Sequence, residues 1–207
     1  MILVTGFAPY KDEFNASGEL VGSLRDDLPN ELLHLKNAIN FEVISVDEAS
    51  REAEHCSLEE QLKNILNKYN PAICIFTGQA PPYNKITIEK IATNTFMREV
   101  IDSERPVAYW SNLPGTENLK DALEEAEIPA AYSYNAGQHL CNHILFSSLY
   151  MAEAFNFGFK SGFVHVPLLP KQVVKSHRES PFMSLEMLRK AMVIIIKQVY
   201  AAYGHNK

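Results

Sequence analysis

Cysteine is scarce in this chain of 207 residues, which contains only Cys56, Cys74 and Cys141. An odd and widely spaced set of cysteines offers no disulfide framework, so a reducing compartment is favoured. The first residues, MILVTGF, also lack the basic start, the long apolar stretch and the small-residue cleavage site of a signal peptide. From these absences we expect a cytoplasmic protein.

Long hydrophobic runs and an excess of positive charge are missing as well. The densest apolar run near the C-terminus, residues 191–196, is far too short to cross a bilayer. The net charge of -6 argues against a nucleic-acid partner, because phosphate binding requires a basic surface. No repeat, linker or low-complexity stretch divides the chain. We therefore expect one domain over residues 1–207, with neither a membrane nor a nucleic acid as its partner.

Short apolar segments alternate with amphipathic segments along the chain. Strands are expected over residues 2–5, 41–46, 72–77, 86–91, 130–134 and 162–166. Helices are expected from the capping-box pattern of Ser57 and Glu60 onward, after Gly115, over residues 141–155 and over about residues 184–203. This alternation predicts an α/β fold whose mainly parallel, twisted sheet is covered by helices on both faces.

The most informative cysteine is Cys141, which follows a glycine-containing turn over residues 135–140. The turn would place its thiol in the first turn of a helix, where free N–H groups and the helix dipole favour the reactive thiolate. The same N–H groups are suited to hold a developing oxyanion. Against this stands the fact that most free cysteines are small core residues. We assign that core role to Cys74, inside an apolar strand, and a surface or packing role to Cys56.

Candidate partners for this cysteine lie at or near the ends of expected strands. His165 lies between two valines on the strand that ends at Pro167, at the carboxyl edge where α/β sheets gather their sites. A base beside a thiol activates it, and a carboxylate is suited to fix the tautomer of that base. Glu89 is one option for the carboxylate. The simpler alternatives are a core histidine and a solvated glutamate.

Two further histidines, His139 and His143, are spaced four residues apart around Cys141. On a helix such a pair is compatible with zinc. No glutamate follows in the metalloprotease pattern, however, and Cys141 would compete as a ligand. We therefore do not expect a metal at these residues.

Several segments are distinctive when they are taken together. They are residues 4–10 (VTGFAPY), 78–80 (GQA) with 86–89 (ITIE), 135–137 (NAG) with 141–143 (CNH), 162–167 (GFVHVP) with 169–172 (LPKQ), and 181–186 (PFMSLE). In this order, and over nearly the whole chain, they resemble the motifs of the pyroglutamyl peptidase I family, also called pyrrolidone-carboxylate peptidases. The last three are the most specific.

This resemblance implies a three-layer α/β/α sandwich, a triad of Cys141, His165 and Glu89, and no metal or organic cofactor. It also implies that Phe7 and Tyr10 are aromatic walls of a pyroglutamate pocket, and that Gln79 lies beside the ring, where main-chain groups of its turn bond the lactam. A flat, uncharged lactam suits such a pocket, whereas a free N-terminal amine would be rejected because burying an unpaired charge is costly. The implied partners are peptides with an N-terminal pyroglutamate and further copies of this chain, in a dimer or a tetramer.

The chain also departs from the family pattern in three loops. Lys11 and Asp12 replace a Gly-Gly pair, and Pro81, Pro82 and Tyr83 replace Gly-Gly-Arg. The family's arginine in a later VDDAR stretch falls at Glu99 by ungapped counting, with Arg98 one place away, and the loop that follows is shorter. Three hypotheses result: a pyroglutamyl peptidase with tolerated changes, a related cysteine hydrolase with a shifted N-terminal acyl preference, and a weakly active peptide-binding homologue.

Overall fold

The computed structural model describes residues 1–10, 13–45, 51–155, 158–176 and 179–205. Its central six-stranded sheet has the order β2-β1-β3-β10-β4-β9. The strands are β1 (Ile2–Phe7), β2 (Ile39–Ile44), β3 (Ile73–Gln79), β4 (Ile86–Glu89), β9 (Ala130–Ser133) and β10 (Lys160–Val166). The helices are α1 (Ala16–Asp26), α2 (Arg51–Tyr69), α3 (Thr116–Glu125), α4 (Leu140–Ala154), α5 (Pro170–Lys175) and α6 (Leu185–His205), with a 3-10 segment η1 (Asn30–Leu35).

Most of this sheet is parallel, as expected. Strand β1 runs parallel to β2 and β3, and β10 runs parallel to β3, so the carboxyl ends of β1, β3 and β10 meet at one edge. Strand β4 is antiparallel to β10, and β9 follows the direction of β4. Only residues 80–85 join β3 to β4. That is too few for a crossover back to the start of the sheet, so the chain turns and β4 runs the opposite way.

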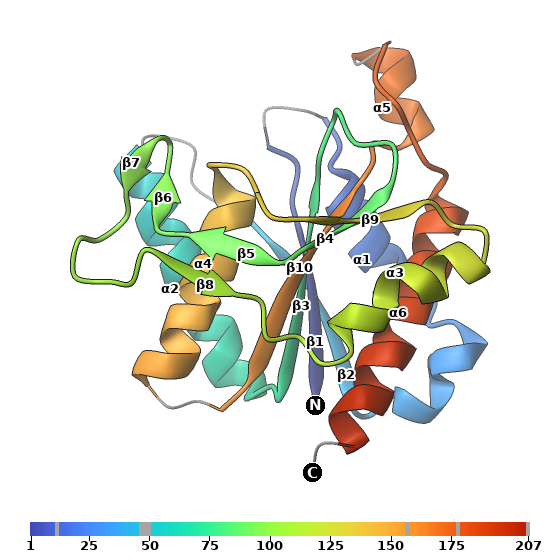
Figure 1. The fold of residues 1–207 in the computed structure, drawn as a ribbon. Coiled ribbons are helices and arrows are strands. Elements are labelled where there is room, and N and C mark those ends of the chain that lie inside the picture. Colours follow the sequence, from blue (N-terminus) through green and yellow to red (C-terminus); the bar gives the residue numbers. More distant parts are fainter. Residues whose placement is uncertain (11–12, 46–50, 156–157, 177–178, 206–207) are drawn as a thin grey trace.

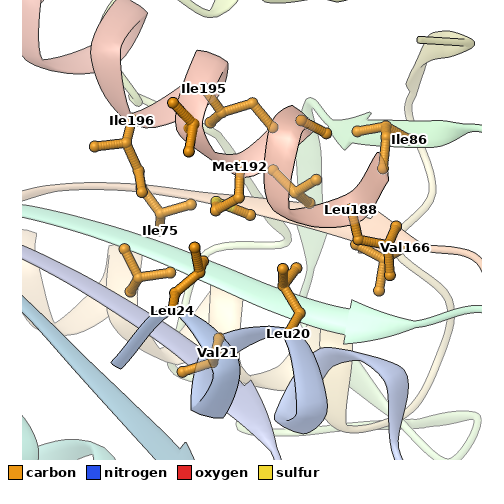
Figure 2. Packing of buried hydrophobic residues seen from close by; sticks show 14 of the residues in the cluster. Leu20, Val21, Leu24, Ile75, Ile86, Val166, Leu188, Met192, Ile195 and Ile196 are labelled. Atoms are coloured by element: carbon orange, nitrogen blue, oxygen red, sulfur yellow. The ribbon is translucent and has the colours of Figure 1, made fainter. Parts of the chain in front are cut away.

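Helices cover both faces of the sheet and complete the three expected layers. Figure 1 shows α2 and α4 on one side and α1, α3 and α6 on the other. Successive residues of each strand face opposite sides. On β10, Val164 and Val166 belong to the aliphatic core under α1 and α6, whereas Phe163 belongs to the second core under α2 and α4. Figure 2 shows the first core, where Leu188, Met192 and Ile195 of α6 pack over the sheet.

Some predicted boundaries were wrong. Helix α2 begins at Arg51, so Ser57 does not cap it. The side chain of Ser57 instead accepts a hydrogen bond from Gln61 one turn later, at 3.3 Å. Residues 51–56 contain no proline or glycine, so nothing stops the helix from extending toward its N-terminus. The expected strand over residues 41–46 is β2, displaced two residues toward the N-terminus, and Val46 lies outside the described residues.

Helix α1 was not predicted, because two glycines interrupt its pattern. Its N-cap is Asn15, whose side chain accepts a hydrogen bond from the Ser17 N–H at 3.0 Å. A Cβ atom on Gly18 would lie 2.2 Å from the Phe7 carbonyl oxygen, and one on Gly6 would lie 2.3 Å from the Ser17 carbonyl oxygen. These glycines therefore let α1 pack directly on the end of β1, next to the expected pocket.

Between β4 and α3 the chain makes an excursion of short strands on the α4 side of the sheet (Figure 1). It contains β5 (Ile91–Thr93), paired with β8 (Ala108–Trp110), and a hairpin of β6 (Thr95–Phe96) and β7 (Glu99–Val100). The single strand expected over residues 86–91 thus divides into β4 and β5 at Lys90. Among the helices described, none is both long and apolar enough to span a membrane.

Candidate active site

Strands β4 and β10 bring Glu89 and His165 together. In their antiparallel register His165 lies opposite Thr87 and Phe163 lies opposite Glu89, so the side chains of Glu89 and His165 share one face of the sheet. The Nδ1 atom of His165 lies 2.7 Å from Oε1 of Glu89. Both residues are buried, with 5% of His165 and none of Glu89 exposed. A buried carboxylate at this distance fixes the proton on Nδ1 and leaves Nε2 for chemistry.

Helix α4 supplies the cysteine from its first turn. Its N-cap is His139, and Cys141 is the second helical residue. Gly137 in the preceding loop has a φ of 85°, and its N–H donates to the Asn135 side chain at 3.0 Å. The left-handed conformation favours glycine and turns the chain into the helix. The thiol is therefore held beside N–H groups that have no partner within the helix.

Gly78 at the end of β3 allows the sulfur to approach the sheet. A Cβ atom at this position would lie 2.7 Å from the Cys141 Sγ and 2.7 Å from Cζ of Phe163. Gly78 is also the register partner of His165. The sulfur thus lies over the backbone position directly beside the histidine, in a space that any side chain at residue 78 would fill.

The electrostatics of the site favour a charged pair. Burial alone lowers the pKa of His165, but the charge of Cys141 and its hydrogen bond, followed by those of Glu89, outweigh burial and raise this pKa to about 9. The protonated imidazole is thus stabilised by two partners, Glu89 from β4 and Cys141 from α4. An imidazole that accepts and holds a proton beside a thiol is the arrangement found where cysteines are activated.

The three residues expected around the substrate differ in their surroundings. Phe7 is buried in the same apolar cluster as Phe96, and Tyr10 and Cys141 pack against that cluster. The ring of Tyr10 lies 5.4 Å from that of His139. The side-chain oxygen of Gln79 accepts hydrogen bonds from the Ala16 N–H at 2.9 Å and from Gln172 at 2.8 Å. Its side chain therefore anchors the turn after β3 to α1 and α5.

Phe96 was not identified from the sequence, although it is fully buried beside the cysteine's helix. Its ring lies 5.4 Å from His139 and 4.8 Å from His143. The sequence signal that could have found it is the strand-like alternation over residues 92–96, because Ala92, Asn94 and Phe96 are all buried. The two histidines considered as zinc ligands thus pack on an aromatic ring. Within the described residues, no group of three His, Cys, Asp or Glu side chains is arranged to hold a metal ion.

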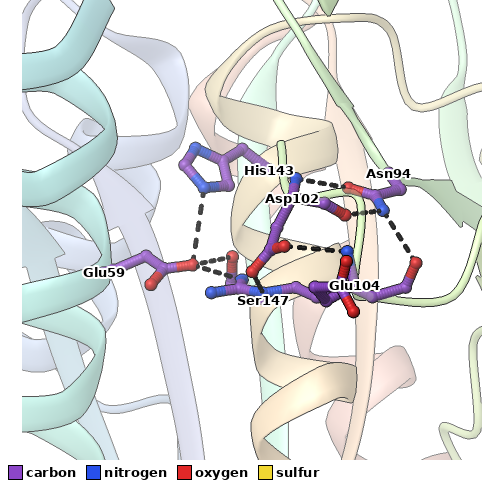
Figure 3. A network of polar contacts seen from close by, with 7 residues as sticks. Glu59, Asn94, Asp102, Glu104, His143 and Ser147 are labelled. Atoms are coloured by element: carbon purple, nitrogen blue, oxygen red, sulfur yellow. Dashed lines mark hydrogen bonds and ion pairs between the residues drawn. The ribbon is translucent and has the colours of Figure 1, made fainter. Parts of the chain in front are cut away.

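A buried polar network fastens the excursion to the helices beside the site (Figure 3). Oε1 of Glu59 on α2 accepts hydrogen bonds from Arg105 at 2.8 Å and from Ser147 of α4 at 2.9 Å, and His143 Nε2 lies 3.8 Å away. Burial alone raises the pKa of Glu59, but His143 and Arg105 more than reverse this effect, so that the pKa lies well below its usual range. Asp102 adds a second contact to Arg105, at 3.2 Å.

Asn142, the residue after the cysteine, holds the near end of the same excursion. Its side chain accepts from the Thr93 N–H at 2.9 Å and donates to the carbonyl oxygens of Thr93 and Thr95 at 2.8 and 2.7 Å. The Met97 N–H donates to the Gln138 carbonyl oxygen at 2.7 Å, in the loop that leads to the cysteine. The excursion is therefore tied to the first turn of α4 from both sides.

The residues compared with the family arginine lie at the tip of this hairpin. Arg98 and Glu99 are both exposed, and Met97 and Arg98 have left-handed backbones with φ of 49° and 70°. Two consecutive left-handed residues form a tight turn, which is unusual for side chains other than glycine or asparagine. Lys11 and Asp12, the other replaced pair, lie outside the described residues.

The remaining cysteines match their expected roles. Cys74 is fully buried in β3, and burial raises the pKa of its thiol far above the ordinary value. Cys56 on α2 is exposed. Only Cys141 therefore combines partial exposure with a helix N-terminus and a neighbouring imidazole.

Comparison with known proteins agrees with this geometry. The family model for pyroglutamyl peptidase matches residues 1–202. The chain belongs to the pyroglutamyl peptidase family. It is 33% identical over 209 residues to the pyrrolidone-carboxylate peptidase of Brachyspira hyodysenteriae, covering 94% of this chain and 96% of that relative. The pyrrolidone-carboxylate peptidase of Thermococcus kodakarensis is 34% identical over 212 residues, covering 96% and 95%.

Solved structures of pyroglutamyl peptidases share the fold as well. The pyrrolidone carboxyl peptidase of Thermococcus litoralis superposes with a TM-score of 0.82 at 28% identity, covering 100% of this chain and 96% of that one. Pyroglutamyl peptidase I of Bacillus amyloliquefaciens gives a TM-score of 0.81 at 27% identity, with 97% and 96% covered. As a member of the pyroglutamyl peptidase family, the chain is an enzyme of the cysteine peptidase class.

Proposed function

We propose that this enzyme hydrolyses the N-terminal pyroglutamyl bond of peptides, with Cys141 as nucleophile, His165 as acid and base, and Glu89 as the group that orients His165. One observation carries the proposal. The histidine that is bonded to Glu89 at 2.7 Å also interacts with the only cysteine placed at a helix N-terminus. This is the arrangement that activates a thiol for acyl transfer.

The reaction begins with attack of the Cys141 thiolate on the carbonyl carbon of the pyroglutamyl residue. The carbonyl oxygen becomes an oxyanion, which the N–H groups of the first turn of α4 are placed to stabilise. The tetrahedral intermediate then collapses and the C–N bond breaks. Protonated His165 gives its proton to the departing amine, and a thioester remains on Cys141.

Water completes the cycle. Neutral His165 removes a proton from a water molecule, whose oxygen attacks the thioester carbon. The C–S bond breaks, pyroglutamate leaves, and the thiolate and the imidazolium form again. Glu89 keeps the imidazole in one tautomer and stabilises its positive charge during both steps.

Specificity would come from the apolar cluster beside the sulfur. Phe7 and Tyr10 are its aromatic members nearest the turn after β1, and they offer flat faces to an uncharged lactam. The main-chain groups of the turn at Gln79 would bond the polar edge of the lactam, because the side chain of Gln79 already pairs with Ala16 and Gln172. A charged amine in this pocket would lose hydration without gaining a partner.

The test is release of aminomethylcoumarin from its pyroglutamyl derivative. We expect Cys141→Ala to reduce release to background and Glu89→Gln to lower kcat about 10²–10⁴-fold, since the amide cannot orient and stabilise the imidazolium. Cys56→Ala is the matched control, because Cys56 is exposed on α2, and it should retain the parent rate. A folded parent without turnover, or an active Cys141→Ala variant, would reject the proposal.

A cysteine hydrolase with a shifted acyl preference is the second candidate. It is favoured by Tyr83, which comes from the replaced Pro81-Pro82-Tyr83 loop and lies against His165, with ring centroids 5.5 Å apart. A panel of prolyl, glutaminyl and acetylated substrates separates the two candidates. Faster turnover of any of these than of the pyroglutamyl substrate would favour the second.

A further inference from the structure

We propose that Tyr83 is a positioning residue, whose ring restrains the His165 imidazole and covers its ion pair with Glu89. The proposal rests on the proposed function, since it assigns to Tyr83 a part in keeping the histidine ready for catalysis. It concerns a residue that replaces the arginine of the Gly-Gly-Arg segment which the family carries there.

The loop between β3 and β4 fixes the backbone position of Tyr83. The Ala80 N–H donates to the Val166 carbonyl oxygen at 3.0 Å, which ties the loop to the strand that carries His165. The Tyr83 N–H then donates to the Ala80 carbonyl oxygen at 3.0 Å and closes a turn. Pro81 and Pro82 occupy its two central positions, where each ring fixes φ. The tyrosine is therefore presented from a short turn with little freedom.

The side chain meets the histidine ring directly. The rings of Tyr83 and His165 are 5.5 Å apart with an interplanar angle of 79°, an edge-to-face contact. Phe163 touches the same imidazole from its own strand, with centroids 4.8 Å apart. Glu89 fixes Nδ1, and the two aromatic rings limit rotation of the imidazole, so Nε2 stays directed toward chemistry at Cys141.

Tyr83 is only partly buried, so its ring contacts the buried His165 and also reaches solvent. Burial raises the pKa of its phenol most, the charges of Glu89 and Cys141 raise it further, and a hydrogen bond with Ser133 lowers it. Glu89 has a second oxygen, Oε2, that is buried and has no hydrogen-bond partner among the described residues. A carboxylate in that state is sensitive to entering water.

The titratable groups that face His165 are therefore Glu89 from β4, Cys141 from α4 and Tyr83 from the loop. The first two carry the charge that stabilises the imidazolium. Removing the ring of Tyr83 would admit water, which screens both charges, and would free the imidazole to rotate. Both effects weaken proton transfer and leave the binding of the acyl group unchanged.

The experiment compares Tyr83→Ala and Tyr83→Phe in a Cys56→Ser background, where Cys141 is the accessible thiol. We expect Tyr83→Ala to lower kcat about tenfold with little change in KM, and to move the alkaline limb of the rate profile toward neutral pH. Tyr83→Phe keeps the ring and should retain the parent kcat and profile within about twofold. Tyr200→Ala, an exposed aromatic on α6, is the matched control and should behave as the parent.

The pH dependence of Cys141 alkylation by iodoacetamide provides a readout that needs no peptide substrate. Tyr83→Ala should narrow the pH range over which alkylation is fast, and Tyr83→Phe should preserve it. If the parent fails to cleave the pyroglutamyl substrate but this difference persists, the proposed function fails and the positioning role stands. Parent-like behaviour of Tyr83→Ala, a change confined to KM, or equal loss in Tyr83→Phe would each overturn the inference.

Discussion

Helices α4 and α6 cover opposite faces of one sheet, yet they do so with different chemistry. The buried side of α6 is aliphatic, with Leu188, Met192, Ile195, Ile196 and Val199 among its members. The buried side of α4 includes Asn142, His143, Ser147 and Ser148. Every polar group on such a face needs a partner, because a buried unpaired group costs about 1–3 kcal/mol. The partners of Asn142 and Ser147 come from the excursion and from α2, whereas Ser148 bonds to Leu145 of its own helix and to Ser161 of β10.

The comparison indicates that the two faces contribute different properties, stability on one side and the arrangement of the site on the other. The α6 face supplies stability through contact area, which does not depend on pH or salt. The α4 face uses directional bonds, which are sensitive to both, to hold the excursion against the active site. Substitutions on the two faces should therefore separate stability from activity, and three predictions test this separation.

The largest effect on stability is expected from Ile195→Ala on α6. Ile195 is fully buried in the aliphatic core shown in Figure 2, so its truncation leaves a cavity and should cost about 2–5 kcal/mol. The rate constant kcat at a temperature where the variant is folded should stay within about twofold. Urea unfolding and the coumarin assay measure the two quantities. Lys197→Ala, at an exposed position of the same helix, is the control, and an equal loss there would contradict the assignment.

A smaller loss in the free energy of unfolding, of about 1–3 kcal/mol, is expected from Glu59→Gln on the α4 side of the sheet. The reason is that Arg105 and His143 lose their shared anion. Here KM should rise as well, since the excursion that contacts the loop before Cys141 is loosened. The low pKa of Glu59 also means that its contribution is present above the ordinary carboxyl pKa and is lost as pH falls. Glu124→Gln, in an exposed pair with Lys120, should cost less than about 1 kcal/mol. Equal losses in the two variants would refute the distinction.

The smallest change is one of pH dependence without any substitution. In the proposed mechanism His165 is protonated when the amine departs, so kcat/KM should decline as pH rises through about 9, the raised pKa of this group. The protonated histidine likewise contributes stability that is complete below its ordinary value of 6.5 and is lost as pH rises through about 9. Rate profiles and melting temperatures from pH 6 to about 10 measure both. A decline centred near the ordinary value would show that the anionic partners have little influence.

Local patterns predicted the elements that carry the site better than they predicted its surroundings. The apolar run over residues 162–166 predicted the strand that carries His165 near its carboxyl end, and the glycine-containing turn placed Cys141 at the start of a helix. Helix α1 was missed because Gly18 and Gly22 weaken its pattern, whereas Gly18 is needed for contact with β1. The roles of Cys141, His165 and Glu89 themselves came from resemblance and stay predictions until they are measured.

Contacts between distant segments could not be predicted from spacing. Arg105 and Glu59 are 46 residues apart in sequence, and neither neighbourhood contains a motif that pairs them. The contact of Tyr83 with His165 depends on where a proline-containing turn directs one side chain, which a single sequence does not specify. In both cases, the tertiary arrangement determines which polar or aromatic groups meet.

The hydrogen atom that serves as the side chain of Gly78 has a consequence for natural and designed variants. Because the Cys141 sulfur and the Phe163 ring both occupy the space of a Cβ atom there, a single added methyl group would compete with the sulfur for its position. A Gly78→Ala substitution should therefore reduce turnover although the rest of the sequence is unchanged. Homologues that carry anything other than glycine there are therefore candidates for members that have kept the fold and given up turnover.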